Sequence, residues 1–398
     1  MASTERAYVF NPQDIADLLS NYYQQLVRMR YLSADSIKYP PHDPGIDVEY
    51  AQSLGLDPQV IELLKVMPYV EGYGGEDEML SAGSFVDFRN KSSLEQSRDP
   101  DYALYRANKT QPDPGYEEEN GQYVMPWVCV LNSCGNHGSI IYLDTRNGEI
   151  THVWQGGAGG GCADLFFYRK ERPEIPEHPV NKNRIEHFPH RPAKEFFKYY
   201  ANRLQNLQDV PNSDGMRFVS GYPEFDHPGS KEYQEFRTLY LTFGWPNKFD
   251  TEGFDQALKR YLEFHRVEYD ALEIKNKIET NRKYCEEHAG EEHDKQGLLE
   301  YAEAQLKEGL EEAGETDLED VDSMMEVGWA QHLKRQIRWN SDNLNFYKSK
   351  GKDREGAQTK IVEIEEVVKV FERRLKEVSK QPKTALEAIL PAWNNLDS

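Results

Sequence analysis

Cysteine and histidine side chains gather in one short segment of this 398-residue chain. Cys134 and His137 are separated by two residues, Cys129 precedes them and Cys162 follows. A cysteine beside a histidine could act as a nucleophile, with Asp144 orienting the imidazole. The same cysteines and histidine could instead bind zinc, but zinc sites usually show two close ligand pairs, and the second pair is missing here. Cys129 also falls within an apolar strand pattern, which favours a place in the core.

A glycine-rich run, Gly156–Gly161, lies shortly after this segment. Consecutive glycine amides can cradle an anion. A phosphate-binding loop also needs a Lys-Ser/Thr pair directly after the glycines. The residues between these glycines and Arg169 include no lysine. We therefore expect a connecting loop here rather than a phosphate site.

A second group of metal-binding residue types, Cys285, His288 and His293, lies among glutamates with little apolar sequence around it. A solvated helix end is the expected structure, although such a segment could bind metal adventitiously. The chain contains no serine nucleophile elbow, no HExxH motif and no dinucleotide-binding fingerprint. We predict no catalytic residue, no metal site and no cofactor.

Two amphipathic helices are expected to open the fold that positions these residues. Asn11 followed by Pro12 is a helix start signal, and apolar residues then recur at helical spacing as far as Met29. A second, shorter helix covers residues 58–67. Pro68 ends it, because proline lacks the amide that a continuing helix would use.

The clearest strand signals come after residues 72–121, whose Gly, Asp, Pro and Ser content predicts a long insertion. Residues 123–132 and 139–154 are rich in β-branched and aromatic side chains. The second run is interrupted by an Asn-Gly pair, which supplies the positive φ of a tight turn and so predicts an antiparallel hairpin. An aromatic helix from about residue 193 to 208 is expected to close this unit.

The composition changes after Pro211, and long helices dominate the sequence beyond the Gly/Pro-rich linker GYPEFDHPGS at residues 221–230. Helices are expected over residues 231–243, 251–282, 296–312, 320–347 and 357–378. The last one carries apolar residues at alternating spacings of three and four from Ile361 to Val378, which is the seam of a helical hairpin or coiled coil. The helix bearing Phe254 is the expected cover for this seam, with a second protein as the alternative.

The charge balance bears on the partners that the protein can have. Lysine and arginine number 47 against 69 acidic residues, which gives a net charge of −22. Such a surface repels phosphate backbones and anionic lipid, so nucleic acid and membrane are not expected as partners. No run of 18 apolar residues occurs, and four cysteines are too few for a disulfide scaffold. These features favour the cytosol or the nucleus.

Four features of the first half occur together in a known family. They are the leading amphipathic helix, the helix ending at Met67-Pro68, the hairpin GSIIYLDTRNGEITHVW and the aromatic helix EFFKYY. Over residues 11–208 the chain resembles the SUKH superfamily, which includes fungal cell-wall-synthesis regulators and bacterial toxin-immunity proteins, and it looks like a fungal member. The resemblance implies an α+β domain that binds other proteins through its sheet and loops. Scaffold and immunity-like roles are both open.

We therefore predict an α+β fold with two parts. An antiparallel sheet with flanking helices covers residues 11–208, with the insertion at 72–121. An acidic, mainly α-helical region covers residues 209–398, forms a bundle, and is separable from the first part. The core of the first part is expected to contain Leu18, Leu26, Leu64, Ile141, Ile150, Phe197 and Leu204.

The predicted function is a non-enzymatic protein-interaction module or signalling scaffold, with other proteins, basic ones among them, as partners. One alternative is a cysteine-dependent enzyme that uses Cys134 and His137. The other is a purely structural helical scaffold. The candidate protein-binding residues are Trp154, Gly157, Phe166 and Phe167.

Overall fold

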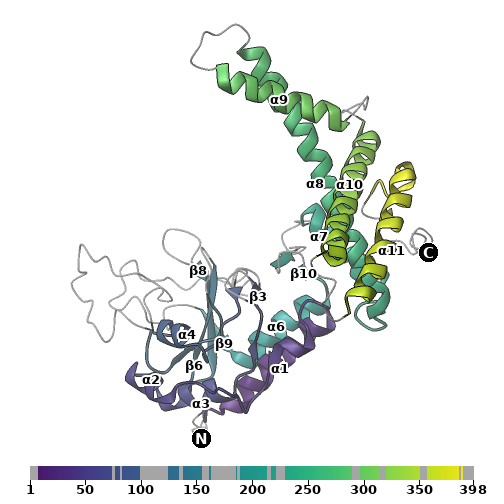
Figure 1. The fold of residues 1–398 in the computed structure, drawn as a ribbon. Coiled ribbons are helices and arrows are strands. Elements are labelled where there is room, and N and C mark those ends of the chain that lie inside the picture. Colours follow the sequence, from purple (N-terminus) through teal and green to yellow (C-terminus); the bar gives the residue numbers. More distant parts are fainter. Residues whose placement is uncertain are drawn as a thin grey trace, which may run out of the picture. The chain divides into compact units, whose positions relative to one another are not determined.

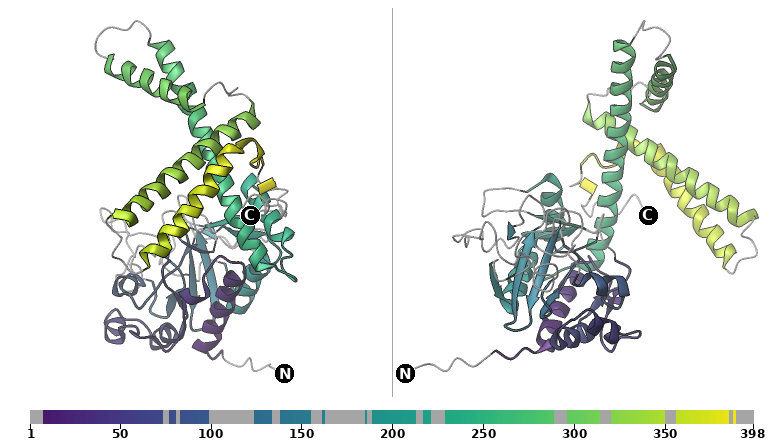
Figure 2. Two further views of the ribbon diagram at one scale, coloured as in Figure 1. Left: turned by 45° about the vertical axis from the view of Figure 1, so that its right-hand side comes forward. Right: turned by 90° about the vertical axis from the view of Figure 1, so that its left-hand side faces the viewer.

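Strands and helices alternate along the first part of the chain, and long helices follow in the second (Figure 1; further views in Figure 2). This computed structural model confirms the predicted α+β class with a mainly helical second half. The chain divides into two units, Met1–Phe249 and Asp250–Ser398. The described residues are 8–73, 77–80, 83–98, 124–133, 138–154, 161–162, 185, 189–212, 217–220, 229–288, 296–313, 320–349, 356–384 and 387–388.

The first unit opens with the predicted helix α1 (Pro12–Arg28). The Asn11 side chain accepts a hydrogen bond from the backbone N–H of Gln13, which caps the helix. The expectation that Leu18 belongs to the core was wrong, because this side chain is half-buried, whereas its neighbour Leu19 is fully buried. The other six predicted core residues are buried.

The remaining elements before the main sheet are short. They are η1 (Ala34–Ser36), β1 (Ile37–Lys38), α2 (Val48–Ser53), α3 (Pro58–Val66), β2 (Tyr69–Val70), β3 (Glu78–Leu80), β4 (Gly83–Ser84) and α4 (Lys91–Gln96). The strands pair as β1 with β2 and β3 with β4, both antiparallel. Helix α3 is the predicted second helix, and α4 with the β3–β4 pair falls inside the predicted insertion at 72–121. Residues 99–121 of that insertion lie outside the described residues.

The main sheet is antiparallel and is built around the predicted hairpin. Its strands are β5 (Val128–Val130), β6 (Ser139–Asp144), β7 (Glu149–Trp154), β8 (Gly161–Cys162) and β9 (His190–Pro192), in the order β5-β6-β7-β8, with β9 also paired to β7. Gly148, at φ +70°, closes the β6–β7 turn. Helix α6 (Ala193–Gln205) packs against β7, and α1 packs against α6 and α3 (Figure 1).

The first unit extends further along the chain than the sequence suggested. A hairpin of β10 (Asp209–Asn212) and β11 (Arg217–Ser220) lies directly before the predicted linker, and α7 (Lys231–Thr242) follows that linker. The Tyr240 hydroxyl donates to the carbonyl of Met29 at 2.7 Å, and the Trp245 indole donates to the carbonyl of Gln205 at 3.1 Å. These bonds attach α7 to the first unit, so the boundary lies after Phe249 rather than after residue 208.

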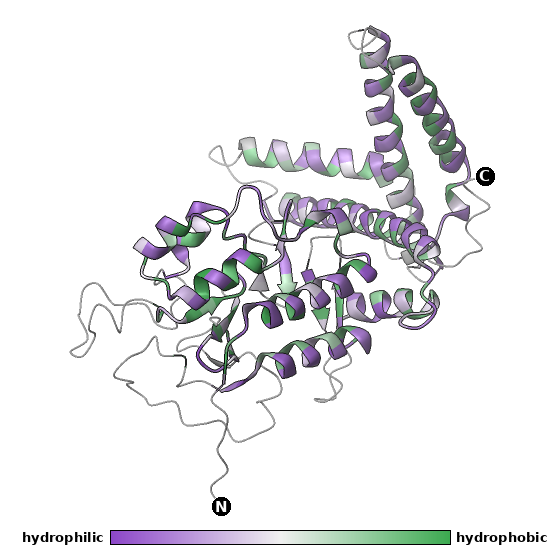
Figure 3. Ribbon diagram, turned by 90° about the horizontal axis from the view of Figure 1, so that it is seen from below, coloured by the Kyte–Doolittle hydropathy of each residue, from purple (hydrophilic) through white to green (hydrophobic). Residues whose placement is uncertain are grey.

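The second unit consists mainly of four long helices, α8 (Thr251–Glu287), α9 (Gln296–Ala313), α10 (Val321–Ser349) and α11 (Ala357–Lys376), followed by η6 (Val378–Lys380). All four were predicted. Stripes of hydrophobic and hydrophilic residues alternate along them in Figure 3, as amphipathic helices require. Helices α8 and α10 approach closely at Gly328, where an added Cβ would lie 2.5 Å from the carbonyl oxygen of Val267.

Helix α11 packs mainly against α10, and this differs from the predicted cover by the helix that bears Phe254. The Lys348 ammonium and the Glu365 carboxylate form an ion pair at 2.6 Å between α10 and α11. The seam residues from Ile361 to Leu375 are only half-buried. The short connection between α10 and α11 favours this pairing of sequence neighbours.

A polar cluster and a C-terminal segment complete the core of the second unit. Arg374 forms a bidentate pair with Glu263 at 2.9 and 3.2 Å. The buried Trp329 indole donates to the carbonyl of Pro382 at 2.8 Å, and Ala388 is buried at the end of the same segment. Residues that follow α11 in the sequence therefore seal the core that α8 and α10 form.

Candidate functional site

The predicted binding residues, and the Cys134 and His137 of the alternative enzyme hypothesis, lie in a region that the structure describes only in part. Cys134, His137, Gly157, Phe166 and Phe167 fall outside the described residues, as does the run 156–160 of the glycine loop. Trp154 lies in β7, paired with Ser139 of β6, but its side chain is not described. The predicted binding surface at these residues stays a prediction, and cysteine chemistry at Cys134 and His137 stays an untested alternative.

Cys129 and Asp144 belong to the described part of this segment, and both are engaged in the sheet. Burial raises the pKa of the Cys129 thiol to about 12, so it stays protonated and is a poor nucleophile near neutral pH. The buried Asp144 carboxylate accepts hydrogen bonds from the backbone and guanidinium of Arg146, at 2.9 and 3.0 Å. The Arg146 guanidinium in turn lies 4.1 Å from the centre of the Trp127 ring.

The Cys285 segment forms the end of α8, as predicted. His288 stacks on Tyr284, with ring centres 4.1 Å apart, and its Nδ1 lies 2.9 Å from the Tyr284 carbonyl oxygen. His293 lies outside the described residues. Within the described ranges, no three His, Cys, Asp or Glu side chains are grouped so that they could hold a metal ion.

A buried histidine that sequence reasoning missed lies between the sheet and α6. His152 of β7 has its Nδ1 2.9 Å from the Tyr200 hydroxyl and its ring edge-on to Phe196. Burial, and then the charge of Arg191, lowers the pKa of His152 to about 3. Its Nε2 is buried without a hydrogen-bond partner among the described residues. A neutral imidazole here helps to attach α6 to the sheet.

A buried ion pair lies one turn further along α6. Arg203 donates from Nε and Nη2 to the Asp209 carboxylate at 2.6 and 2.9 Å, and Ser220 donates to the same carboxylate at 2.7 Å. Burial by itself would lower the pKa of Arg203, but its hydrogen bond and charge interaction with Asp209 outweigh that effect and raise it. Both charges are satisfied, so this cluster joins α6 to the β10–β11 hairpin and has a structural role.

The second unit contains a different kind of site, which depends on how α9 is attached to α8. Leu306 packs against a cluster that includes Ile274 and Ile278. Gly309 allows close approach, because an added Cβ would lie 2.8 Å from Ile278 Cγ1. The Lys277 ammonium lies 2.9 Å from the carboxylate of Glu308 and also pairs with a second glutamate of α9. One face of α9 is thereby fixed against α8.

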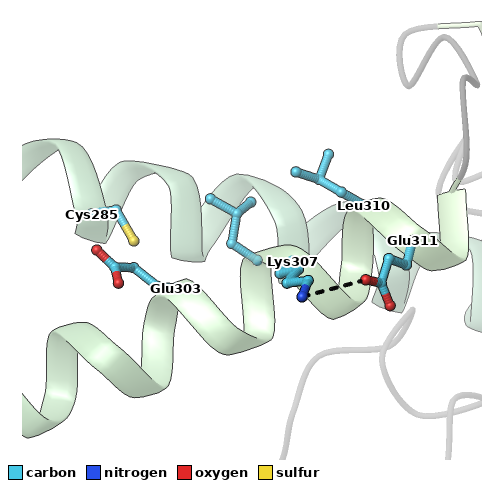
Figure 4. A pocket seen from close by; sticks show the side chains of 6 residues that line it. Cys285, Glu303, Lys307, Leu310 and Glu311 are labelled. Atoms are coloured by element: carbon cyan, nitrogen blue, oxygen red, sulfur yellow. Dashed lines mark ion pairs between the residues drawn. The ribbon is translucent and has the colours of Figure 1, made fainter.

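A hollow of about 620 Å³ opens beside this contact (Figure 4). We call it the α8–α9 groove. It is lined by Cys285, Glu303, Leu306, Lys307, Leu310 and Glu311. The Cys285 thiol and the Glu303 carboxylate point toward one another across its end, and Lys307 pairs with Glu311 at 3.9 Å (Figure 4). Leucine side chains therefore lie between charged ones on an open surface.

Apolar exposure is concentrated in the second unit. Of the thirteen large apolar side chains that are exposed among the described residues, nine belong to α8, α9, α10 or α11. On α9 these include Leu298, Tyr301 and Leu310, with exposed fractions of 59%, 64% and 41%. Single exposed leucines are ordinary on protein surfaces, but an exposed leucine that lines a hollow, as Leu310 does, is a candidate for an interaction site.

Across the described ranges, no helix combines the length and the hydropathy that crossing a bilayer requires. Comparison with models of protein families gives no match, and comparisons with curated proteins and with solved structures give none either.

Sequence reasoning missed the α8–α9 groove because no local motif marks it. Cys285 and Leu310 are far apart along the chain, and the packing of α9 on α8 brings them together. The available signal was the spacing of Leu306 and Leu310, one helical turn apart with glutamates on both sides. That spacing predicts an apolar stripe but does not indicate which part of the stripe stays uncovered.

Proposed function

We propose that this chain is a non-catalytic protein-binding module and that the α8–α9 groove is its binding surface. The observation that carries the proposal is a hollow whose wall includes an exposed leucine, Leu310, held on a helix that is itself fixed by packing. Because Leu310 is 41% exposed, covering the rest of its side chain with a partner stabilises a complex by about 1 kcal/mol. The groove is open along two helices, which suits an extended or helical partner segment better than a small molecule.

The resemblance of residues 11–208 to SUKH domains supports the same kind of function, since it implies a domain that binds proteins. Under this proposal the first unit supplies a second binding surface, and Trp154, Gly157, Phe166 and Phe167 are its candidates. The chain as a whole would then act as a scaffold with two binding units. The engaged Asp144 carboxylate and the protonated Cys129 thiol are consistent with a structural rather than catalytic role for the described part of this segment.

The test compares one substitution in the groove with a matched one elsewhere. Leu310→Asp places a charge in the groove, and Leu241→Asp makes the same change at a leucine of α7 that is 47% exposed. Proteins captured by the native chain should be retained by Leu241→Asp and lost with Leu310→Asp. Equal retention by all three chains would show that the groove is not the binding surface.

A further inference from the structure

The charge around the α8–α9 groove points to the chemistry of its partner. Helix α9 contains five glutamates and a single lysine, Lys307. This inference rests on the proposed function, because it concerns the occupant of the same groove. We infer that the groove binds a basic amphipathic helix, which presents leucine-like side chains to the groove and lysine or arginine side chains to its acidic edge.

The carboxylates of α9 fall into two sets. Lys277 pairs with both Glu308 and Glu312 at 2.9 and 3.6 Å, and Glu311 pairs with Lys307. The hydrogen bond from Lys277 is the main reason that the pKa of Glu308 is lowered. These glutamates are therefore already occupied in holding α9 in place.

Glu300 and Glu303 form the second set. Within the described part of the chain, neither has an ion-pair or hydrogen-bond partner. Glu303 lines the groove, and Glu300 lies one turn earlier on the same helix. Lysine or arginine side chains of a bound chain could form ion pairs with both of these carboxylates. An acidic partner would instead bring like charges together at the edge of the groove.

The apolar part of the groove sets the second requirement. Leu306 and Leu310 are spaced by four residues, so they present apolar surface along one turn of α9. A partner helix matches such a surface with apolar side chains at i, i+3, i+4 and i+7. A purely basic segment without leucines would satisfy the charges but would leave the apolar wall exposed.

The experiment uses the full chain and two designed helical peptides. Both carry leucines at i, i+3, i+4 and i+7, and their polar faces carry lysines in one and glutamates in the other. Binding is measured by fluorescence anisotropy at low and at physiological salt. The lysine peptide should bind at least about tenfold more tightly than the glutamate peptide, and its affinity should fall as salt rises.

Variants separate the groove from general attraction to a chain of charge −22. Leu310→Asp adds a negative charge, which would strengthen nonspecific binding of the lysine peptide, yet it should weaken binding at least about tenfold if the apolar wall is used. Glu303→Lys should weaken the lysine peptide about two- to fivefold. Glu49→Lys, an exposed position on α2, and Leu241→Asp should have no effect.

The outcomes distinguish this inference from the proposed function. If both peptides bind equally and Leu310→Asp abolishes both, the groove binds proteins but the inferred preference for basic partners is wrong. If neither peptide binds, or Leu310→Asp has no effect, the groove is not a docking site and both proposals fail. A second copy of this chain is the remaining candidate occupant, and analytical sedimentation tests it. A dimer that dissociates in Leu310→Asp would show that a second copy fills the groove. That result would overturn the inference of a basic helical partner.

Discussion

Protonation of His152 should make the first unit unfold more easily in mild acid. The folded pKa of His152 is about 3, below its ordinary value of 6.5, because the ring is buried next to the charge of Arg191. A proton therefore binds the unfolded chain more tightly than the folded one. The stability that depends on the neutral ring is fully present above about pH 6.5 and is lost as the pH falls towards 3.

The size of the effect follows from these two pKa values. Between pH 7 and pH 5 the free energy of unfolding should fall by about 2 kcal/mol from this single group. His152→Asn removes the titration and keeps a polar group near the Tyr200 hydroxyl, so its unfolding free energy should depend less on pH by the same amount. His190→Asn on β9 is the control, because His190 is largely exposed and the variant should retain the pH dependence of the native chain.

The assay is urea unfolding at pH 7 and pH 5, with hydrogen exchange of the β6 and β7 amides as the reporter for the first unit. Proton NMR of the His152 ring measures the pKa directly. A His152 ring that titrates above pH 5, or equal pH dependence in the native chain and His152→Asn, would refute the assignment of a buried neutral imidazole.

Other substitutions test the packing described above. Leu19→Ala should cost about 2–5 kcal/mol of stability because its side chain is fully buried, whereas Leu18→Ala should cost clearly less, and thermal melts of the two variants would expose an error if their order were reversed. Arg203→Met leaves the Asp209 carboxylate buried without its partner and should cost about 3–5 kcal/mol, and Arg203→Met combined with Asp209→Leu should recover much of it. The two units, expressed separately with the boundary after Phe249, should each melt cooperatively, and an insoluble fragment would contradict that boundary.

Local signals were sufficient to predict most helices. Asn11-Pro12 marked the start of α1, and the spacing from Ile361 onwards marked α11, because capping and amphipathic spacing act within a few residues. The Asn-Gly pair likewise located the β6–β7 turn, where Gly148 has the positive φ that such turns need.

Features that depend on tertiary packing, such as which residue of a helix is buried, could not be predicted from local signals. Leu18 and Leu19 both fit the apolar spacing of α1, and only the packing of the unit determines which one is buried. The hairpin at Asp209–Ser220 was not predicted, because its strands are only four residues long and β10 contains a proline. The α8–α9 groove depends on the contact of two helices, which no single window of sequence reveals.

The contact between Trp329 and the segment that follows α11 has a consequence for synthesis of the chain. A chain made from its N-terminus folds its earlier domains first. The first unit can therefore close while the helices are still being translated, but the indole of Trp329 has its carbonyl acceptor only after Pro382 has emerged. Until then an aromatic side chain that is destined for the core remains open to water and to chaperones. A premature stop in α11 would leave the helical unit in that state permanently, which predicts rapid degradation of such a product rather than a stable shortened protein.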